Sequence, residues 1–224
     1  MKKIIMGVMI LGLLSVSQNS FAFENIEIEE NITPAQTQEV QTTKPLAAQV
    51  TFDWLDISQA QRDEQIEKYK NLLFNSAQQG GVYYTKDQFK KEFSKYAKDK
   101  EYKHHYMLAN NGVTDDEDAK YCAFYYKKNT LVIYAIQYKK NPHNAFYYTA
   151  FGKLYYVDVT SSDYPNFPYY SMQYNRKGKL KSAIYFVSKD IQYMYGPDGD
   201  FQGIWYKDKM YDSNGKQTLT RSNW

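Results

Sequence analysis

The residues that could support nucleophilic chemistry are one cysteine and three histidines. Cys122 with His104, His105 or His143 is the only combination that would pair a thiol with an imidazole. The sequence around Cys122, residues 121–124, is typical of a strand, whereas activated cysteines commonly lie at helix amino termini or beside a cation. We therefore interpret Cys122 as a buried small side chain without a catalytic role.

Other polar clusters resemble metal sites only in part. Glu101 precedes the pair His104–His105 by one helical turn, but two ligands do not make a metal site, so we interpret this segment as a solvated helix end. The acidic run at residues 115–118 lacks the alternating ligands, glycine and terminal glutamate of a calcium loop, and we expect a solvated loop. Residues 198–200 and 212–215 are better explained as turns. We expect no metal and no cofactor.

Motifs of the common enzyme classes are absent from the sequence. It contains no glycine-rich phosphate loop, no serine-hydrolase elbow and no zinc signature. A glycosidase needs two carboxylates that face each other across a cleft, and no spacing identifies such a pair among many acids. The sequence therefore leans away from an enzyme, with a hydrolase that uses unrecognised carboxylates as the alternative.

The amino terminus predicts export. Lys2 and Lys3 precede an apolar run at residues 4–16, and residues 20–22 supply small side chains at the two positions that a signal peptidase recognises. We expect residues 1–22 to be a cleaved signal peptide and the protein to be periplasmic or extracellular. The apolar run is shorter than the roughly 20 residues that cross a bilayer, so we expect no stable membrane span after cleavage.

Composition divides the remaining chain into two parts. Residues 23–48 are polar, contain Pro34 and Pro45 and show no period, which predicts a disordered spacer. We expect residues 49–224 to form a single domain. The whole chain has a formal charge of +3, and its basic residues are not concentrated, so we expect no nucleic-acid partner.

The first part of the domain, about residues 52–110, predicts two helices. Ser58 and Gln61 form a capping box before a helix from residue 59 to about residue 75, and a second helix is expected at about residues 86–108. We expect Trp54 and Leu55 to cover the helix pair as a hydrophobic lid.

The second part, about residues 120–221, predicts a sheet. The chain contains 24 tyrosines and 12 phenylalanines, which favour half-buried strands. The strand at 130–138 is apolar on both faces, so we expect it to be central. The fold class is therefore α+β, with two N-terminal helices packed on a long antiparallel β-meander that ends in hairpin repeats. Strands are expected at residues 121–126, 130–138, 145–151, 154–159, 169–174, 180–187, 191–195, 201–206 and 217–221.

Three turns near the C-terminus place a glycine four residues after a tyrosine, and in each the glycine supplies the positive φ that closes a hairpin. We interpret them as ordinary hairpins, with a true repeat array as the alternative. The pairs are Tyr174 with Gly178, Tyr195 with Gly199 and Tyr211 with Gly215.

The same region resembles a known family. Gly203-Ile204-Trp205, followed by Tyr211-Asp212-Ser213-Asn214-Gly215-Lys216, is similar to the units of MORN-variant repeat proteins, and Gly178-Lys179-Leu180 is similar to their return strand. The resemblance covers about residues 170–221. Gln217 stands where the family pattern has an apolar residue. The resemblance implies a β-hairpin interaction surface, sometimes associated with toxin-neutralising antitoxins.

Runs of neighbouring aromatic residues supply the candidate binding surface. Because adjacent strand residues point to opposite faces, each pair exposes one ring unless both faces are covered. Exposed tyrosines offer a rigid apolar plate with a polar tip that suits sugars or a protein partner. Packing of these rings on a covered second face is the alternative. The candidate residues are Tyr147, Tyr148, Tyr164, Tyr169 and Tyr170.

These observations predict a tyrosine-rich, secreted or periplasmic, non-enzymatic binding or protein-interaction module that acts at the cell envelope or outside the cell. The expected partner is an envelope protein or a glycan. The alternative function is a cell-envelope hydrolase.

Overall fold

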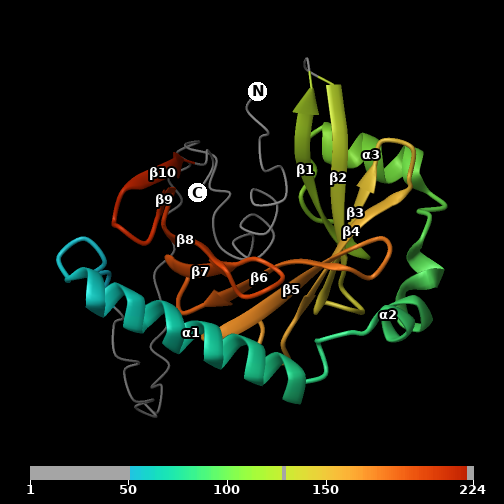
Figure 1. Ribbon diagram of the computed structural model, residues 1–224. Helices are drawn as coiled ribbons and strands as arrows, with labels where there is room; N and C mark the ends of the chain where they lie inside the picture. The colour runs from blue at the N-terminus through green and yellow to red at the C-terminus, as the bar shows by residue number, and fades with distance from the viewer. Residues whose placement is uncertain (1–50, 128–129, 221–224) are drawn as a thin grey trace, which may run out of the picture.

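The computed structural model describes residues 51–127 and 130–220. The expected signal peptide and spacer lie outside the described residues, as does part of the turn after the first predicted strand. Within the described part, three α-helices precede a single sheet of ten antiparallel strands (Figure 1). The α+β class with a long β-meander is therefore confirmed. No helix of the described part is both long and apolar enough to cross a bilayer.

Helix α1 (Gln59–Gln79) begins where the sequence predicts. The hydroxyl of Ser58 accepts a hydrogen bond from the backbone of Gln61, and the Gln61 side chain accepts one from the backbone of Ser58. The helix ends at Gln79, four residues later than expected from periodicity, because Ala77 extends the face that is buried against the sheet, and Gly80 is its C-cap.

The predicted second helix is not continuous. It divides into α2 (Lys86–Phe93), a 3₁₀ turn (Ser94–Tyr96) and α3 (Tyr102–Asn110). Between the last two, the chain pairs with the start of strand β4: Lys98 forms an isolated bridge with Lys153, and the amide of Asp99 donates to the carbonyl of Gly152 at 2.8 Å. These hydrogen bonds with the sheet replace those that a continuous helix would have made.

The strands follow one another in the sheet in their order along the chain, from β1 to β10. Strand β2 is one from the edge rather than central, although it is buried on both faces. The sequence did not predict the three-residue strand β9. The bounds are β1 (Ala119–Lys127), β2 (Thr130–Tyr138), β3 (Asn144–Thr149), β4 (Leu154–Thr160), β5 (Tyr169–Asn175), β6 (Leu180–Phe186), β7 (Ile191–Tyr195), β8 (Phe201–Tyr206), β9 (Lys209–Tyr211) and β10 (Gln217–Thr220).

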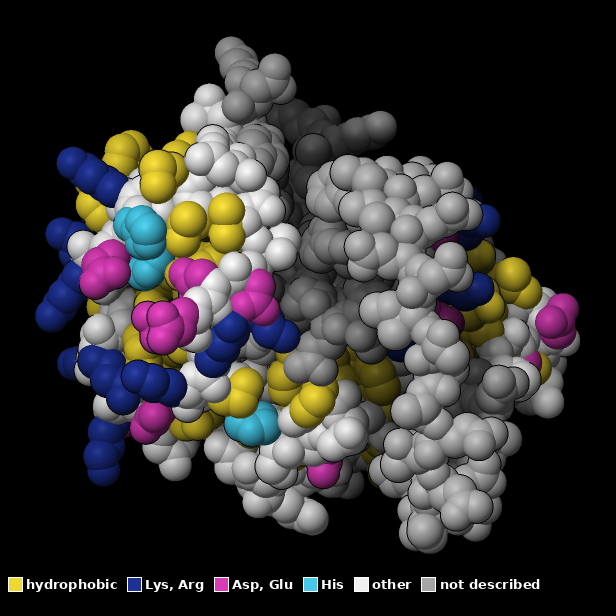
Figure 2. Space-filling view, turned by 180° about the vertical axis from the view of Figure 1, so that it is seen from behind, with side chains coloured by type: hydrophobic (Ala, Val, Ile, Leu, Met, Phe, Trp, Pro, Cys, Tyr) yellow, Lys and Arg dark blue, Asp and Glu magenta, His cyan; other side chains and the backbone are white. Residues whose placement is uncertain are grey.

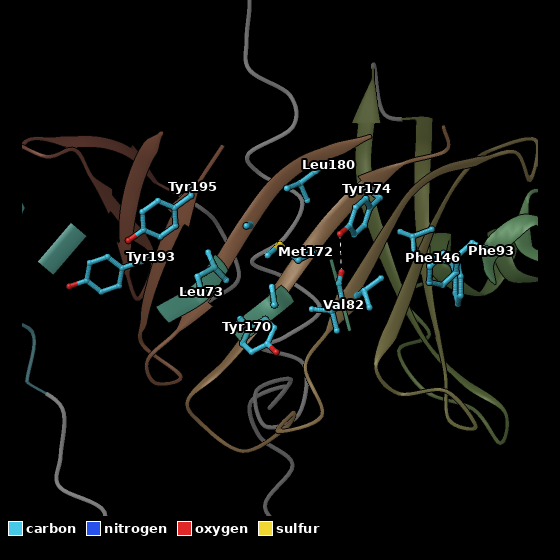
Figure 3. Close-up of a cluster of buried hydrophobic side chains, with 14 of the residues drawn as sticks. Leu73, Val82, Phe93, Phe146, Tyr170, Met172, Tyr174, Leu180, Tyr193 and Tyr195 are labelled. Carbon is cyan, nitrogen blue, oxygen red and sulfur yellow. Dashed lines mark hydrogen bonds between the residues drawn. The ribbon is translucent and has the colours of Figure 1, made fainter. Parts of the chain in front are cut away.

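The helices cover one face of a curved sheet. Helix α1 contacts β5, β6 and β7, and α3 contacts β1 and β2 (Figure 1). Tyrosine hydroxyls join the two layers: Tyr174 donates to the carbonyl of Val82 at 2.8 Å, as Figure 3 shows, and Tyr195 donates to that of Ile66 at 2.8 Å. These contacts use both the ring and the hydroxyl, because the ring fills the interlayer space and the oxygen satisfies a backbone group.

The three predicted tyrosine–glycine turns share one geometry. In each, the residue after the tyrosine donates its amide hydrogen to the carbonyl four residues later, at 2.8–3.0 Å. The glycine amide in turn donates to the carbonyl of the residue that follows the tyrosine. Gly178, Gly199 and Gly215 have φ angles of 74°, 80° and 78°. This left-handed conformation favours glycine, which has no Cβ to clash with the backbone.

A fourth turn has the same geometry and was not predicted. Thr149 donates to the carbonyl of Lys153 at 2.9 Å, and Gly152 has a φ of 71°. Tyr148 precedes Gly152 by four residues, so the spacing that marks the other three turns marks this one as well. In all four hairpins the tyrosine pairs with the residue six positions later.

Trp54 and Leu55 do not form the expected lid on the helix pair. Trp54 is fully buried against the sheet, with its ring 5.9 Å from that of Tyr193 and its indole N–H donating to the carbonyl of Asp212 at 3.1 Å. Leu55 is exposed. The indole packs on the sheet because the sheet provides both aromatic contacts and a hydrogen-bond acceptor.

Candidate functional site

The expected tyrosine surface is not present. None of Tyr147, Tyr148, Tyr164, Tyr169 and Tyr170 is more than 7% exposed. Because strand residues alternate, Tyr148 and Tyr170 face the helices while Tyr147 and Tyr169 face the opposite side of the sheet, where two further hydrophobic clusters bury them. These rings therefore pack the core, and exposed aromatic plates must be sought elsewhere.

The residues of the predicted repeat are also structural. Tyr174, Tyr195 and Tyr211 belong to the core between helices and sheet. Trp205 lies on the opposite face, where its indole N–H contacts the sulfur of Met194 at 2.9 Å. Gly203 packs so closely on β9 that an added Cβ would meet the side chain of Met210. These positions shape the sheet rather than line a pocket.

Cys122 is half-buried in β1, and burial raises the pKa of its thiol to about 11. Its sulfur contacts the carbonyl of Ala123 and, within the described part of the chain, hydrogen-bonds no histidine. His143 instead bonds the carbonyl of Ser161 at 3.1 Å. The cysteine is therefore a protonated, weakly reactive group, because the thiolate is the nucleophile.

Charged and titratable side chains line a pocket of about 410 Å³ at the border between the helices and the sheet, which we call the α3 pocket. Charged side chains and histidines gather on the part of the surface that contains α3 (Figure 2). Its lining combines four lysines, four acids, two histidines and four tyrosines: Lys95, Lys98, Lys100, Lys140, Asp99, Glu101, Asp116, Asp118, His104, His105, Tyr96, Tyr121, Tyr138 and Tyr148.

A buried carboxylate organises this pocket. Asp99 is 4% exposed and lies in the break between the 3₁₀ turn and α3. Its Oδ2 lies 2.8 Å from His105 Nδ1 and accepts the hydroxyl hydrogen of Tyr134 at 2.6 Å, while its Oδ1 accepts the backbone N–H of Glu101 at 3.0 Å. Asp99 thereby ties the start of α3 to strand β2.

His105 is the second buried member. Its Nε2 lies 3.8 Å from a carboxylate oxygen of Glu101, whose side chain is mostly exposed. Burial opposes the charged imidazole, but the hydrogen bond and negative charge of Asp99 outweigh it and raise the pKa of His105. Burial likewise opposes ionisation of Asp99, yet hydrogen bonds from His105 and Tyr134 lower the pKa of that carboxyl. The two groups therefore form an ion pair in weakly acidic solution.

The acidic loop at residues 115–118 forms the other wall. Three of its acids are exposed, as expected, but Asp116 accepts the Tyr121 hydroxyl at 2.6 Å and the backbone N–H of Ala119 at 2.8 Å. Burial of Tyr121 and its bond to Asp116 raise the pKa of the phenol. The carboxylate is thus engaged by its own loop. In the described ranges, no group of three or more His, Cys, Asp or Glu side chains is arranged so that it could hold a metal ion.

Sequence reasoning found part of this site. It placed Glu101 one helical turn before the pair His104–His105 and interpreted the whole segment as a solvated helix end. The structure buries His105 and supplies Asp99 as its partner, so that interpretation was wrong for His105 and correct for the exposed His104. A continuous helix would have placed Asp99 on another face, and only the break turns it inward.

A second buried acid lies on the sheet face opposite the helices. Asp158 accepts the hydroxyl hydrogen of Tyr147 at 2.7 Å. Burial raises the pKa of Asp158 to about 7, and the hydrogen bond from Tyr147 opposes the rise. With only 5% of the residue exposed, this carboxyl contributes to the core rather than to an open site.

The fold and the α3 pocket define a class of protein: an α+β domain in which three helices cover one face of an antiparallel meander and a polar pocket opens at their border. No protein-family model, curated protein or solved structure matches the chain.

Proposed function

We propose that this protein is an exported, non-enzymatic binding module that holds a glycan of the cell envelope in the α3 pocket. The observation that carries the proposal is the composition of the lining, in which four lysines and four acids are combined with two partly exposed tyrosines, Tyr96 and Tyr138. Carboxylates accept hydroxyl hydrogens, lysines donate, and tyrosine rings pack on the apolar faces of sugars.

The engagement of two pocket carboxylates by neighbouring groups supports a binding role. Asp99 already accepts three hydrogen bonds, and Asp116 accepts the Tyr121 hydroxyl and backbone N–H groups of its own loop. Export remains part of the proposal and is supported by the amino-terminal sequence. The MORN-variant resemblance also remains a proposal, and the geometry shared by four hairpin turns supports it.

Retention of the purified mature chain on isolated envelope material tests the proposal. We expect cell wall from the native host to retain the protein and soluble glycan fragments to release it. The double variant Lys98→Ala, Glu101→Ala removes one positive and one negative group from the pocket rim and should abolish retention. The control Glu64→Ala, Lys68→Ala removes the same charges from exposed positions on α1 and should bind normally.

Two results would contradict glycan binding. One is retention of an envelope protein with none of the wall, which would favour the protein-interaction module instead. The other is equal retention of the pocket variant and the control.

A specific observation also supports the alternative of an envelope hydrolase. A histidine held by a buried carboxylate, with Nε2 close to Glu101, has the arrangement of a positioned proton-transfer group. Release of new reducing ends from wall glycan would support this function, provided that His105→Gln and Glu101→Gln each abolish it. Unchanged glycan after prolonged incubation would exclude that substrate.

A further inference from the structure

A second cavity lies beside α2 and has a different charge character. It has a volume of about 570 Å³ and is bounded by α2, the start of β4 and the β5–β6 turn; we call it the basic groove. Five cations and a single acid line it, together with an apolar floor. The cations are Lys86, Lys90, Lys153, Arg176 and Lys177, the acid is Asp87, and the floor contains Phe89, Phe93, Ala97 and Leu154.

The five cations are not neutralised within the described part of the chain. All are exposed, and none forms an ion pair with a described acid. Lys86 and Lys90 are four residues apart on α2, a spacing at which like charges repel. An anion in the groove would relieve this repulsion, and the aromatic floor would strengthen the attraction by excluding water from one side.

The backbone that carries Arg176 and Lys177 is held in place. The amide of Arg176 donates to the carbonyl of Tyr155 at 3.2 Å, and that of Lys177 donates to the Asn175 side chain at 2.9 Å. The same turn packs on α2, since a Cβ added to Gly178 would lie 3.0 Å from the Cβ of Phe89. The backbone of this turn is therefore already fixed beside α2, and binding of an anion by Arg176 and Lys177 does not have to order a loop first.

The basic groove adjoins the α3 pocket. Lys98, which lines the pocket, forms a backbone bridge with Lys153, which lines the groove. The α3 pocket has equal numbers of lysines and acids. A glycan chain that places uncharged sugars in this pocket would therefore bring its next units to the cationic surface of the basic groove.

We propose that the basic groove binds the anionic groups of a glycan, phosphates or carboxylates, next to sugar units held in the α3 pocket. This inference rests on the proposed glycan-binding function for its sugar part and on the groove itself for its anion part. Arginine and lysine are the side chains that bind phosphate and carboxylate oxygens through charge-assisted hydrogen bonds. The ligand class is therefore an acidic envelope glycan rather than a neutral one.

Titration calorimetry with the mature chain tests this inference, using a phosphorylated oligosaccharide and the same oligosaccharide after dephosphorylation. We expect the phosphorylated form to bind at least about tenfold more tightly, because charge-assisted contacts are the strong ones. The variant Lys153→Glu, Arg176→Glu should remove this preference. The control Lys189→Glu, Lys209→Glu makes the same charge change in the β6–β7 connection and in β9, and should keep it.

Inorganic tripolyphosphate separates the two proposals, since it contains no sugar. If tripolyphosphate binds to the wild type and to the control variant but not to the groove variant, the anion site is supported. This holds even if the neutral oligosaccharide does not bind, because that result would refute the glycan pocket alone. Equal affinity for the two oligosaccharides, or equal loss of tripolyphosphate binding in both variants, would overturn the anion site. Circular dichroism and thermal unfolding of each variant verify that the fold is intact.

Discussion

Replacement of Asp99 by asparagine would remove the charge at the centre of the α3 pocket and keep its shape. The carboxylate accepts three hydrogen bonds and forms a buried ion pair with His105. Breaking a buried pair costs about 3–5 kcal/mol when the remaining charge has no partner. Here the imidazole can lose its proton and the asparagine oxygen can still accept, so we expect a loss of about 2–4 kcal/mol in the free energy of unfolding.

The pH dependence of this loss identifies its cause. The pKa of His105 is raised in the folded protein, so its contribution is complete below the unfolded histidine value of about 6.5 and disappears as pH rises through the folded value. The pKa of Asp99 is lowered, so its contribution is complete above about 3.9 and disappears as pH falls through the folded value. The difference between wild type and variant should be largest between about pH 4 and pH 6.5.

Urea unfolding followed by circular dichroism at several pH values would measure the difference, and for a chain of this size the melting temperature should fall by about 2–4 °C per kcal/mol. Asp198→Asn, at an exposed turn position, is the control and should change stability by less than about 0.5 kcal/mol. A double-mutant cycle with His105→Gln should show strong coupling. A loss that is the same at every pH, or a negligible coupling energy, would refute the ion pair as the organising contact.

Three further predictions concern the core and the thiol. Tyr174→Phe should lower the unfolding free energy by about 1–3 kcal/mol, because the hydroxyl bonds two backbone groups after α1, whereas Tyr206→Phe should have little effect in the same urea titration. Gly178→Ala should cost about 1–2 kcal/mol, since its φ is 74° and the added methyl group would press on Phe89; a neutral effect would show that the turn relaxes freely. With its pKa raised to about 11, the Cys122 thiol should react with a disulfide reagent at pH 8 far more slowly in the native state than in urea. Equal rates in the two states would contradict its burial.

Patterns local in sequence predicted most of the elements. The capping box at Ser58, the aromatic-rich runs of the strands and the glycines of three turns each depend on residues within one turn or one hairpin, and each was found where expected. The fourth turn follows the same spacing, from Tyr148 to Gly152, and could have been found by the same search. Tyrosine enrichment correctly indicated a sheet, although the rings are inside it.

Contacts between distant residues decided the rest. The break before α3 exists because residues 97–99 bond with the start of β4, and that break brings Asp99 to His105 and Tyr134. Whether a tyrosine is exposed depends on what covers each face of the sheet, which strand alternation alone does not reveal. The sequence by itself therefore determined the fold class and the turn chemistry, because these follow from local backbone preferences. Only the tertiary structure decided the pocket and the basic groove, because both are formed by side chains that the folded sheet brings together from separate elements.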